Sequence, residues 1–110
     1  MIPPEIISVI ETLETSGQRP ILVATSDVDL PFVVFCIPTI KDLSTYVAKA
    51  SDASVGPLMA AIGLSRISAH YPSQDHIEKT VRLRPFVVMR AVQVLLGELG
   101  LAARAEKKSL

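Results

Sequence analysis

The stretch that decides the fold runs from Pro85 to Leu99 and reads PFVVMRAVQVLLGEL. Apart from Glu98, which lies alone on the far flank, its polar or glycine positions and those just beyond it repeat at intervals of three and four: Arg90, Gln93, Gly97, Gly100 and Arg104. At 3.6 residues per turn these positions form one stripe roughly 100° wide, and Phe86 lies near it. Such an apolar helix must be buried on most sides, and a 110-residue chain has little else to cover it. We therefore expect this helix to meet a partner protein or a second copy of the chain.

The composition around this helix predicts one small domain with exposed apolar surface. The chain has no Trp, few aromatic residues and a mean hydropathy of +0.42, so branched aliphatic residues must fill the core. Apolar patches left on a surface usually mark interfaces. We predict a single domain over residues 1–103, followed by a polar, flexible tail over residues 104–110.

Charge is divided unevenly along the chain although the formal net charge is zero. Residues 1–55 carry three basic and seven acidic side chains, and residues 56–110 carry eight basic and four acidic ones. This asymmetry has two interpretations. Either an acidic end attracts the basic end of another copy, or the two halves pack against each other within one chain.

The cysteine count and the chain start favour a cytoplasmic protein. Cys36 is the only cysteine, so no intramolecular disulfide forms, and its apolar surroundings indicate a core residue. The first residues lack the features of a signal peptide. A membrane span over residues 86–103 is rejected because Arg90, Gln93 and Glu98 lie within it, and each charge near the bilayer centre costs about 2.5–3.5 kcal/mol.

Two short apolar runs predict a β-hairpin, about residues 20–25 and 31–37. The segment between them, from Ser26 to Asp29, has side chains that favour turns because they bond their own backbone. The second run, PFVVFCI, is apolar on both faces. Helices must therefore cover both faces of this strand, or one face awaits a partner.

Helix signals surround the hairpin and predict an α+β fold with four to five helices and a mainly helical C-terminal half. Thr39 and Asp42 resemble a capping box, and Ser73 is a candidate N-cap. Ser16-Gly17 and Gly100 are expected helix ends, and Arg84 before Pro85 predicts a bend. The expected helices span about residues 4–16, 39–50, 56–67, 74–83 and 85–99.

The polar residues do not form a recognisable catalytic or metal-binding pattern. Cys36 lies in an apolar strand, where an activated thiolate is disfavoured. His70 and His76 lack the spacing of metal ligands, and we interpret them as loop and helix-cap residues. Asp27 and Asp29 could hold a divalent ion, but their position favours turn chemistry. We predict no catalytic residue, no cofactor and no metal.

A cluster of arginines around the Pro85 bend raises the question of nucleic acid binding. Arg82, Arg84 and Arg90 could contact phosphates. The helix that follows is apolar where a recognition helix must be polar, and interleaved aromatic residues are missing. Solvated arginines, or salt bridges to the acidic half of the chain, are the preferred interpretation, and we predict neither a nucleic acid nor a membrane partner.

From the second strand onward, the order of features resembles the tail assembly chaperones of long-tailed bacteriophages. The resemblance covers about residues 20–101 and depends on PTIKDL (38–43), the Arg84-Pro85 junction and LGELG (96–100). It implies a small protein without catalytic residues that self-associates and binds the tape-measure protein, covering apolar stretches of that helical client.

We therefore predict a non-enzymatic assembly factor that binds a protein client, itself, or both, and that forms a homo-oligomer. The residues expected to make the contacts are Phe86, Val87, Val88, Val94 and Leu95 of the apolar helix, with Phe32 and Val34 of the second strand. Two alternatives stay open. One is a structural subunit that assembles through the hairpin edge, and the other is a small enzyme or ligand carrier using Asp27, Cys36 or His76.

Overall fold

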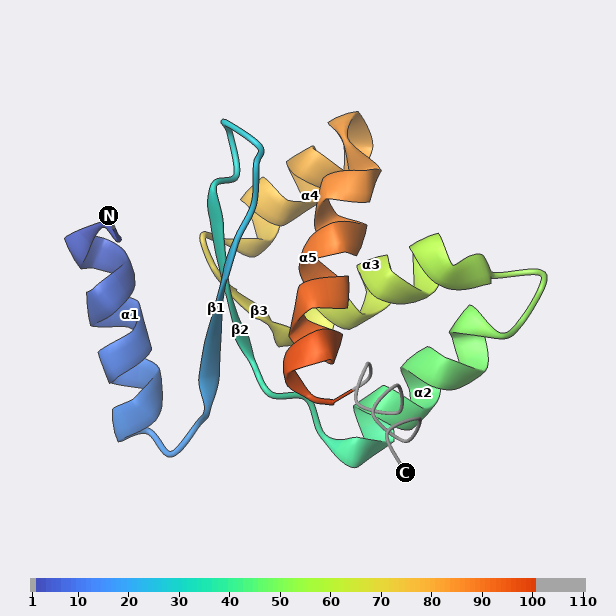
Figure 1. The fold of residues 1–110 in the computed structure, drawn as a ribbon, viewed down its shortest axis with the longest axis horizontal. Coiled ribbons are helices and arrows are strands. Elements are labelled where there is room, and N and C mark those ends of the chain that lie inside the picture. Colours follow the sequence, from blue (N-terminus) through green and yellow to red (C-terminus); the bar gives the residue numbers. More distant parts are fainter. Residues whose placement is uncertain (1, 101–110) are drawn as a thin grey trace, which may run out of the picture.

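A computed structural model describes residues 2–100, which form five helices and three strands (Figure 1). The predicted tail 104–110, and Arg104 of the polar stripe, lie outside the described residues. The elements are α1 (Pro4–Thr15), β1 (Pro20–Ala24), β2 (Phe32–Cys36), α2 (Ile40–Ala50), α3 (Gly56–Ser68), β3 (Ala69–Tyr71), α4 (Gln74–Leu83) and α5 (Pro85–Glu98). The predicted α+β class, the hairpin and the set of helices are confirmed.

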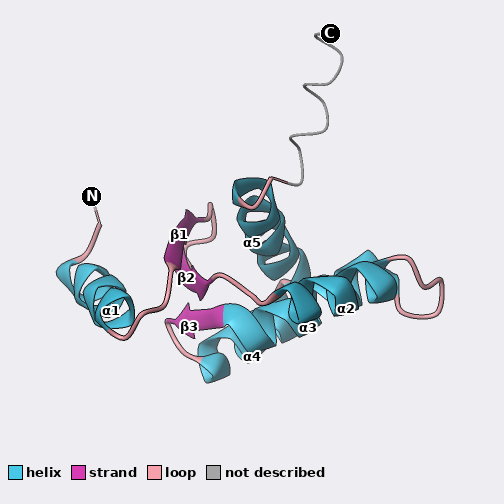
Figure 2. Cartoon of the chain, turned by 90° about the horizontal axis from the view of Figure 1, so that it is seen from below, coloured by secondary structure: helices cyan, strands magenta, loops and turns pink. Residues whose placement is uncertain are grey.

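The strands form one antiparallel sheet in the order β1-β2-β3. In the hairpin, Leu22 lies opposite Val34 and Val23 lies opposite Val33. Figure 2 shows α1 on one side of the sheet and the other four helices on the opposite side. The sheet is therefore the middle of three layers.

Alternation along β2 explains why this strand is apolar on both faces. Val33 and Phe35 belong to the core between the sheet and the helical layer, whereas Val34 and Cys36 pack with Ile6 of α1. Side chains at successive strand positions point to opposite faces of the sheet. The strand is therefore apolar at consecutive positions because it contributes to the core on each face. Of the two possibilities raised by the sequence, helices covering both faces is the one found.

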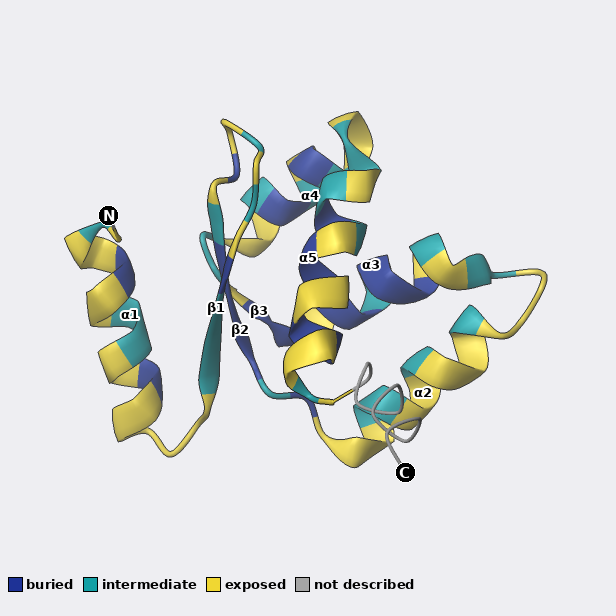
Figure 3. Ribbon diagram, in the orientation of Figure 1, coloured by how far each residue is buried: buried dark blue, intermediate teal, exposed yellow. Residues whose placement is uncertain are grey.

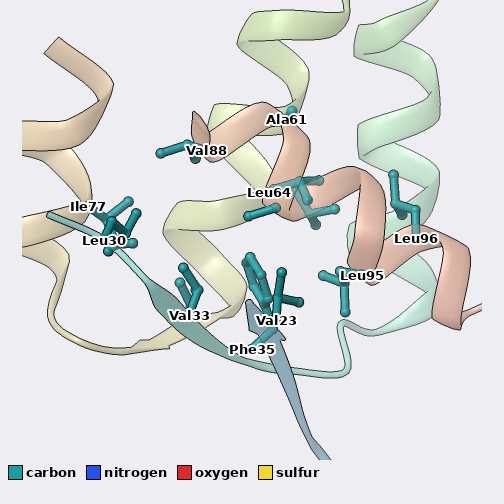
Figure 4. Packing of buried hydrophobic residues seen from close by; sticks show 13 residues of the cluster. Val23, Leu30, Val33, Phe35, Ala61, Leu64, Ile77, Val88, Leu95 and Leu96 are labelled. Carbon is teal, nitrogen blue, oxygen red and sulfur yellow. The ribbon is translucent and has the colours of Figure 1, made fainter. Parts of the chain in front are cut away.

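The apolar helix α5 lies within the chain's own core, which corrects the expectation that the chain has too little to cover it. Figure 4 shows side chains from β1, β2, α3 and α4 converging on it. Figure 3 shows its buried side against the other elements and its exposed turns facing away from them. The buried residues of α5 are Val88, Ala91, Val92, Leu95 and Leu96.

The predicted helix ends are confirmed by hydrogen bonds. Thr39 Oγ1 accepts from Asp42 N at 3.1 Å, and Ser73 Oγ accepts from His76 N at 3.2 Å. At the end of α1, Gly17 has a φ of 87°, a conformation that favours glycine. The Gly17 and Gln18 amides donate to the carbonyls of Glu14 and Leu13, each at 3.0 Å, and this pair of bonds closes the helix.

Three local expectations were wrong. The short strand β3 was missed, and His70, expected in a loop, lies in it. The sequence predicts an apolar stripe on the first helix made of Ile6, Ile7, Ile10 and Leu13, but Ile7 is exposed and Val9 packs against the sheet instead. On α2, the sequence predicts that Leu43, Tyr46 and Val47 face inward, but Val47 is exposed. None of the residues of this helix is buried, because α2 packs mainly on α3 at one end of the molecule (Figure 1).

Candidate functional site

A groove of about 330 Å³ lies between α5 and the end of β1. One wall is formed by α5 and the other by the end of β1 and the first residues of the hairpin loop. The lining residues are Phe86, Val87, Arg90, Ala91 and Val94 on α5, with Ala24, Thr25 and Ser26 on the hairpin. We call this hollow the β1–α5 groove.

The α5 wall exists because the helix has a second apolar face besides the one in the core. Phe86, Arg90 and Val94 are spaced by four residues, so they align along one side of the helix. Phe86 is 59% exposed and Val94 is 48% exposed, whereas Leu95 is completely buried. The groove wall is thus apolar and open to solvent, with one cationic side chain in its middle.

The hairpin wall is shaped by hydrogen bonds inside the loop. Asp27 Oδ1 accepts from the Asp29 amide at 2.8 Å and from the Leu30 amide at 3.1 Å. Thr25 Oγ1 accepts from the Asp27 amide and donates to the Leu30 carbonyl. These contacts confirm the predicted turn chemistry of Asp27 and hold the loop beside the groove in one conformation.

An ion-pair cluster ties this loop to the junction between α4 and α5. Arg84 Nε lies 2.5 Å from Asp27 Oδ2, and Arg84 Nη2 lies 3.2 Å from Asp29 Oδ2. His76 Nε2 donates to the Asp29 carbonyl at 2.7 Å. Because Arg84 belongs to the basic half of the chain and both aspartates to the acidic half, these pairs favour packing of the two halves within one chain.

The cluster also sets the electrostatics around the groove. The Arg84 guanidinium beside Asp27 holds the pKa of that carboxyl below its ordinary value of 3.8, although partial burial opposes the shift. The ion pairs among residues 2–100 join Arg84 to the two aspartates and Arg66 to Glu78, and Arg90 forms none. The charge that faces the groove without a counterion in the described chain is therefore that of Arg90.

The structure divides the seven predicted contact residues into three groups. Phe86, Val87 and Val94 line the groove. Phe32 is half-buried and lines a smaller hollow of about 160 Å³ near α1. The remaining residues, which are at most 1% exposed and cannot reach a partner in this fold, are Val34, Val88 and Leu95.

Sequence reasoning missed the hairpin wall of the groove and the place of Arg90 within it. Ala24, Thr25 and Ser26 gave no signal because their partners on α5 lie about sixty or more positions later in the chain. Arg90 was recognised only as one member of a polar stripe and of an arginine cluster. The opposite charges of Asp27 and Arg84, which lie 57 residues apart, are the sequence signal that could have placed the hairpin loop beside the start of α5.

The residues considered for catalysis lie apart from this groove. Cys36 is buried in the core against α1, and burial raises the pKa of its thiol, which disfavours the thiolate. His76 binds the loop backbone, and His70 is exposed on β3. Across residues 2–100, no three His, Cys, Asp or Glu side chains gather closely enough to hold a metal ion.

Comparisons with protein-family models, with curated proteins and with solved structures found no match to this chain. Within the part of the chain that the structure describes, every helix is too short or too polar to cross a membrane.

Proposed function

We propose that this chain is a non-enzymatic protein-binding factor that holds an apolar segment of a client protein in the β1–α5 groove. The observation that carries the proposal is that Phe86 and Val94 are exposed in the wall of one groove, although the core of the chain is already closed by other residues of α5. An aromatic and an aliphatic side chain around a hollow are the usual anchors of a protein interface. The groove depends on no other chain for its shape.

The ion-pair cluster supports the same proposal. Both walls of the groove belong to one packed body, and Arg84 fixes the loop that continues the β1 wall. A site held in its binding conformation loses less entropy when a client binds. Filling such a hollow with one large apolar side chain contributes about 1.5–3 kcal/mol, so a useful affinity needs further contacts along the groove.

A peptide library tests this proposal and requires no identified client. Displayed random 12-residue peptides are selected on the full chain, and the enriched peptides are titrated by fluorescence polarisation. We expect Val94→Asp and Phe86→Ala to weaken binding at least tenfold. Val47→Asp, at an exposed valine of α2, is the matched control and should leave the affinity unchanged. Peptides that bind Val94→Asp as tightly as the wild type would contradict the proposal.

The resemblance of residues 20–101 to phage tail assembly chaperones suggests the first natural client to test, a tape-measure protein. Co-expression with a tape-measure protein from the same genome should give a complex that Val94→Asp disrupts and Val47→Asp preserves. A genome without a tape-measure gene near this one would overturn the tail-chaperone assignment, and the peptide selection would still test the groove.

Self-assembly through the hairpin is the second candidate function. It is favoured by the open edge of β1, which among residues 2–100 has a strand neighbour only on the β2 side. Light scattering across a concentration series separates the two candidates. A molecular mass that rises with concentration in the wild type, but stays that of a monomer in Leu22→Pro, supports assembly through this edge.

A further inference from the structure

The outer edge of β1 presents unpaired backbone groups beside the groove. The Thr25 amide donates to the Pro31 carbonyl at 2.8 Å, and the Ile37 amide donates to the Arg19 carbonyl at 3.1 Å. In an antiparallel ladder, hydrogen-bonded pairs alternate with pairs that face away. The odd-numbered residues of β1 therefore bond to β2, while Leu22 and Ala24 direct their N–H and C=O groups to the open edge.

This open edge and the apolar wall meet at Ala24, which lines the groove. A helical client has already used its backbone groups internally and would leave the edge of β1 unpaired. An extended segment satisfies the edge and places alternate side chains toward α5. The backbone geometry thus selects an extended client over a helical one.

The charge of Arg90 in the groove wall indicates which side chains the client segment carries. Arg90 lies among the apolar residues of the groove wall and has no ion-pair partner in the described chain, while the nearby Asp27 is neutralised by Arg84. A carboxylate from the client is the complement that Arg90 lacks. The β1 strand of a second copy, PILVA, contains no acidic residue and would leave Arg90 unmatched.

Building on the proposed function, we infer that the client segment binds as an added strand on the open edge of β1. It carries apolar side chains that pack on Phe86 and on Val94, and an Asp or Glu side chain between them that pairs with Arg90. The partner is thus an extended apolar and acidic stretch of another protein. This specifies the conformation and the charge of the segment, which the proposed function leaves open.

A charge exchange tests the acidic preference. Parallel selections from the random peptide library are made on the wild type and on Arg90→Glu, with Arg82→Glu on α4 as the matched control. We expect Asp or Glu to be enriched on the wild type and on Arg82→Glu, and Lys or Arg to be enriched on Arg90→Glu. Equal enrichment of acidic residues on all three proteins would overturn the role of Arg90.

Backbone methylation tests the strand addition. Enriched peptides are resynthesised with one N-methyl group at each position in turn. An added strand bonds to the edge through every second residue, so we expect losses of at least fivefold at alternate positions and little effect between them. Insensitivity to methylation at every position, or helical circular dichroism of the bound peptide, would overturn the added strand.

The outcomes separate this inference from the proposed function. Peptides that lose binding in Val94→Asp but show neither acidic enrichment nor alternate sensitivity to methylation support the groove and overturn the strand. An absence of groove-dependent peptides overturns both. Light scattering that shows a dimer dissociated by Arg90→Glu would assign the edge to a second copy and also overturn the inference.

Discussion

Val92 and Val94 are the same residue type on the same helix, yet Val92 is completely buried and Val94 is 48% exposed. Two positions along a helix correspond to a rotation of about 200°, which turns one valine into the core and the other toward the groove. The helix α5 therefore has apolar residues on two sides, a core side that is apolar throughout and a groove side that also carries Arg90. One face stabilises the fold, and the other is free to bind. Apolar composition alone does not reveal which face is which.

The largest effect on the core face should come from Leu95, which is completely buried. Leu95→Ala removes apolar contacts and leaves a cavity, so we expect it to lower the free energy of unfolding by about 3 kcal/mol. Urea denaturation followed by circular dichroism measures this loss. A loss below about 1 kcal/mol would mean that α5 is not the centre of the core.

The two valines provide the sharpest comparison between the faces. Val92→Ala should lower the free energy of unfolding by about 2 kcal/mol, because two methyl groups leave the core and a cavity forms. Val94→Ala should change it by less than about 0.5 kcal/mol. Parallel urea denaturations of the two variants test this difference. Equal losses would remove the distinction between a core face and a groove face.

A smaller effect on stability is expected when the hairpin wall of the groove is loosened by acid. Because Arg84 depresses the pKa of folded Asp27 below 3.8, the stabilisation is fully present above that pH. It is lost as the pH falls through the folded-state pKa. Thermal stability of the wild type should therefore fall more steeply below about pH 4 than that of Asp27→Asn. Parallel curves for the two proteins would argue against the ion-pair cluster.

The smallest effect on stability, combined with a large effect on binding, is expected for Val94→Asp. This side chain is open to solvent, so the variant should unfold within about 0.5 kcal/mol of the wild type. Its affinity for groove-selected peptides should nevertheless fall at least tenfold. The two measurements are made on the same protein sample. A variant that is strongly destabilised would show that Val94 belongs to the core.

Most of the fold was predictable because its signals are local. Thr39 and Ser73 cap helices, Gly17 and Gly100 end them, and Pro85 starts α5. The strand β3 was not predicted because three residues are too few to show an alternating pattern. Its position depends on pairing with β2, which lies more than thirty residues earlier in the chain.

The candidate site was predictable only in part, since it depends on contacts between distant segments. Phe86, Val87 and Val94 were predicted as contact residues because they are apolar. Val88 and Leu95 were predicted for the same reason, but they are buried in the core. The spacing of residues on a helix separates its faces but does not say which face the rest of the chain covers. Only the docking of α3, α4 and β1 on α5 decides this.

The most direct test of the groove and its open strand edge is amide hydrogen exchange, measured by NMR with and without a groove-selected peptide. We predict that exchange of the Leu22 and Ala24 amides slows at least tenfold on binding. The Ile21 and Val23 amides, already bonded to β2, should change little, and resonances of Phe86, Arg90 and Val94 should shift. Binding that leaves the Leu22 and Ala24 amides unprotected, or that shifts residues of α2 instead, would contradict a client strand on β1.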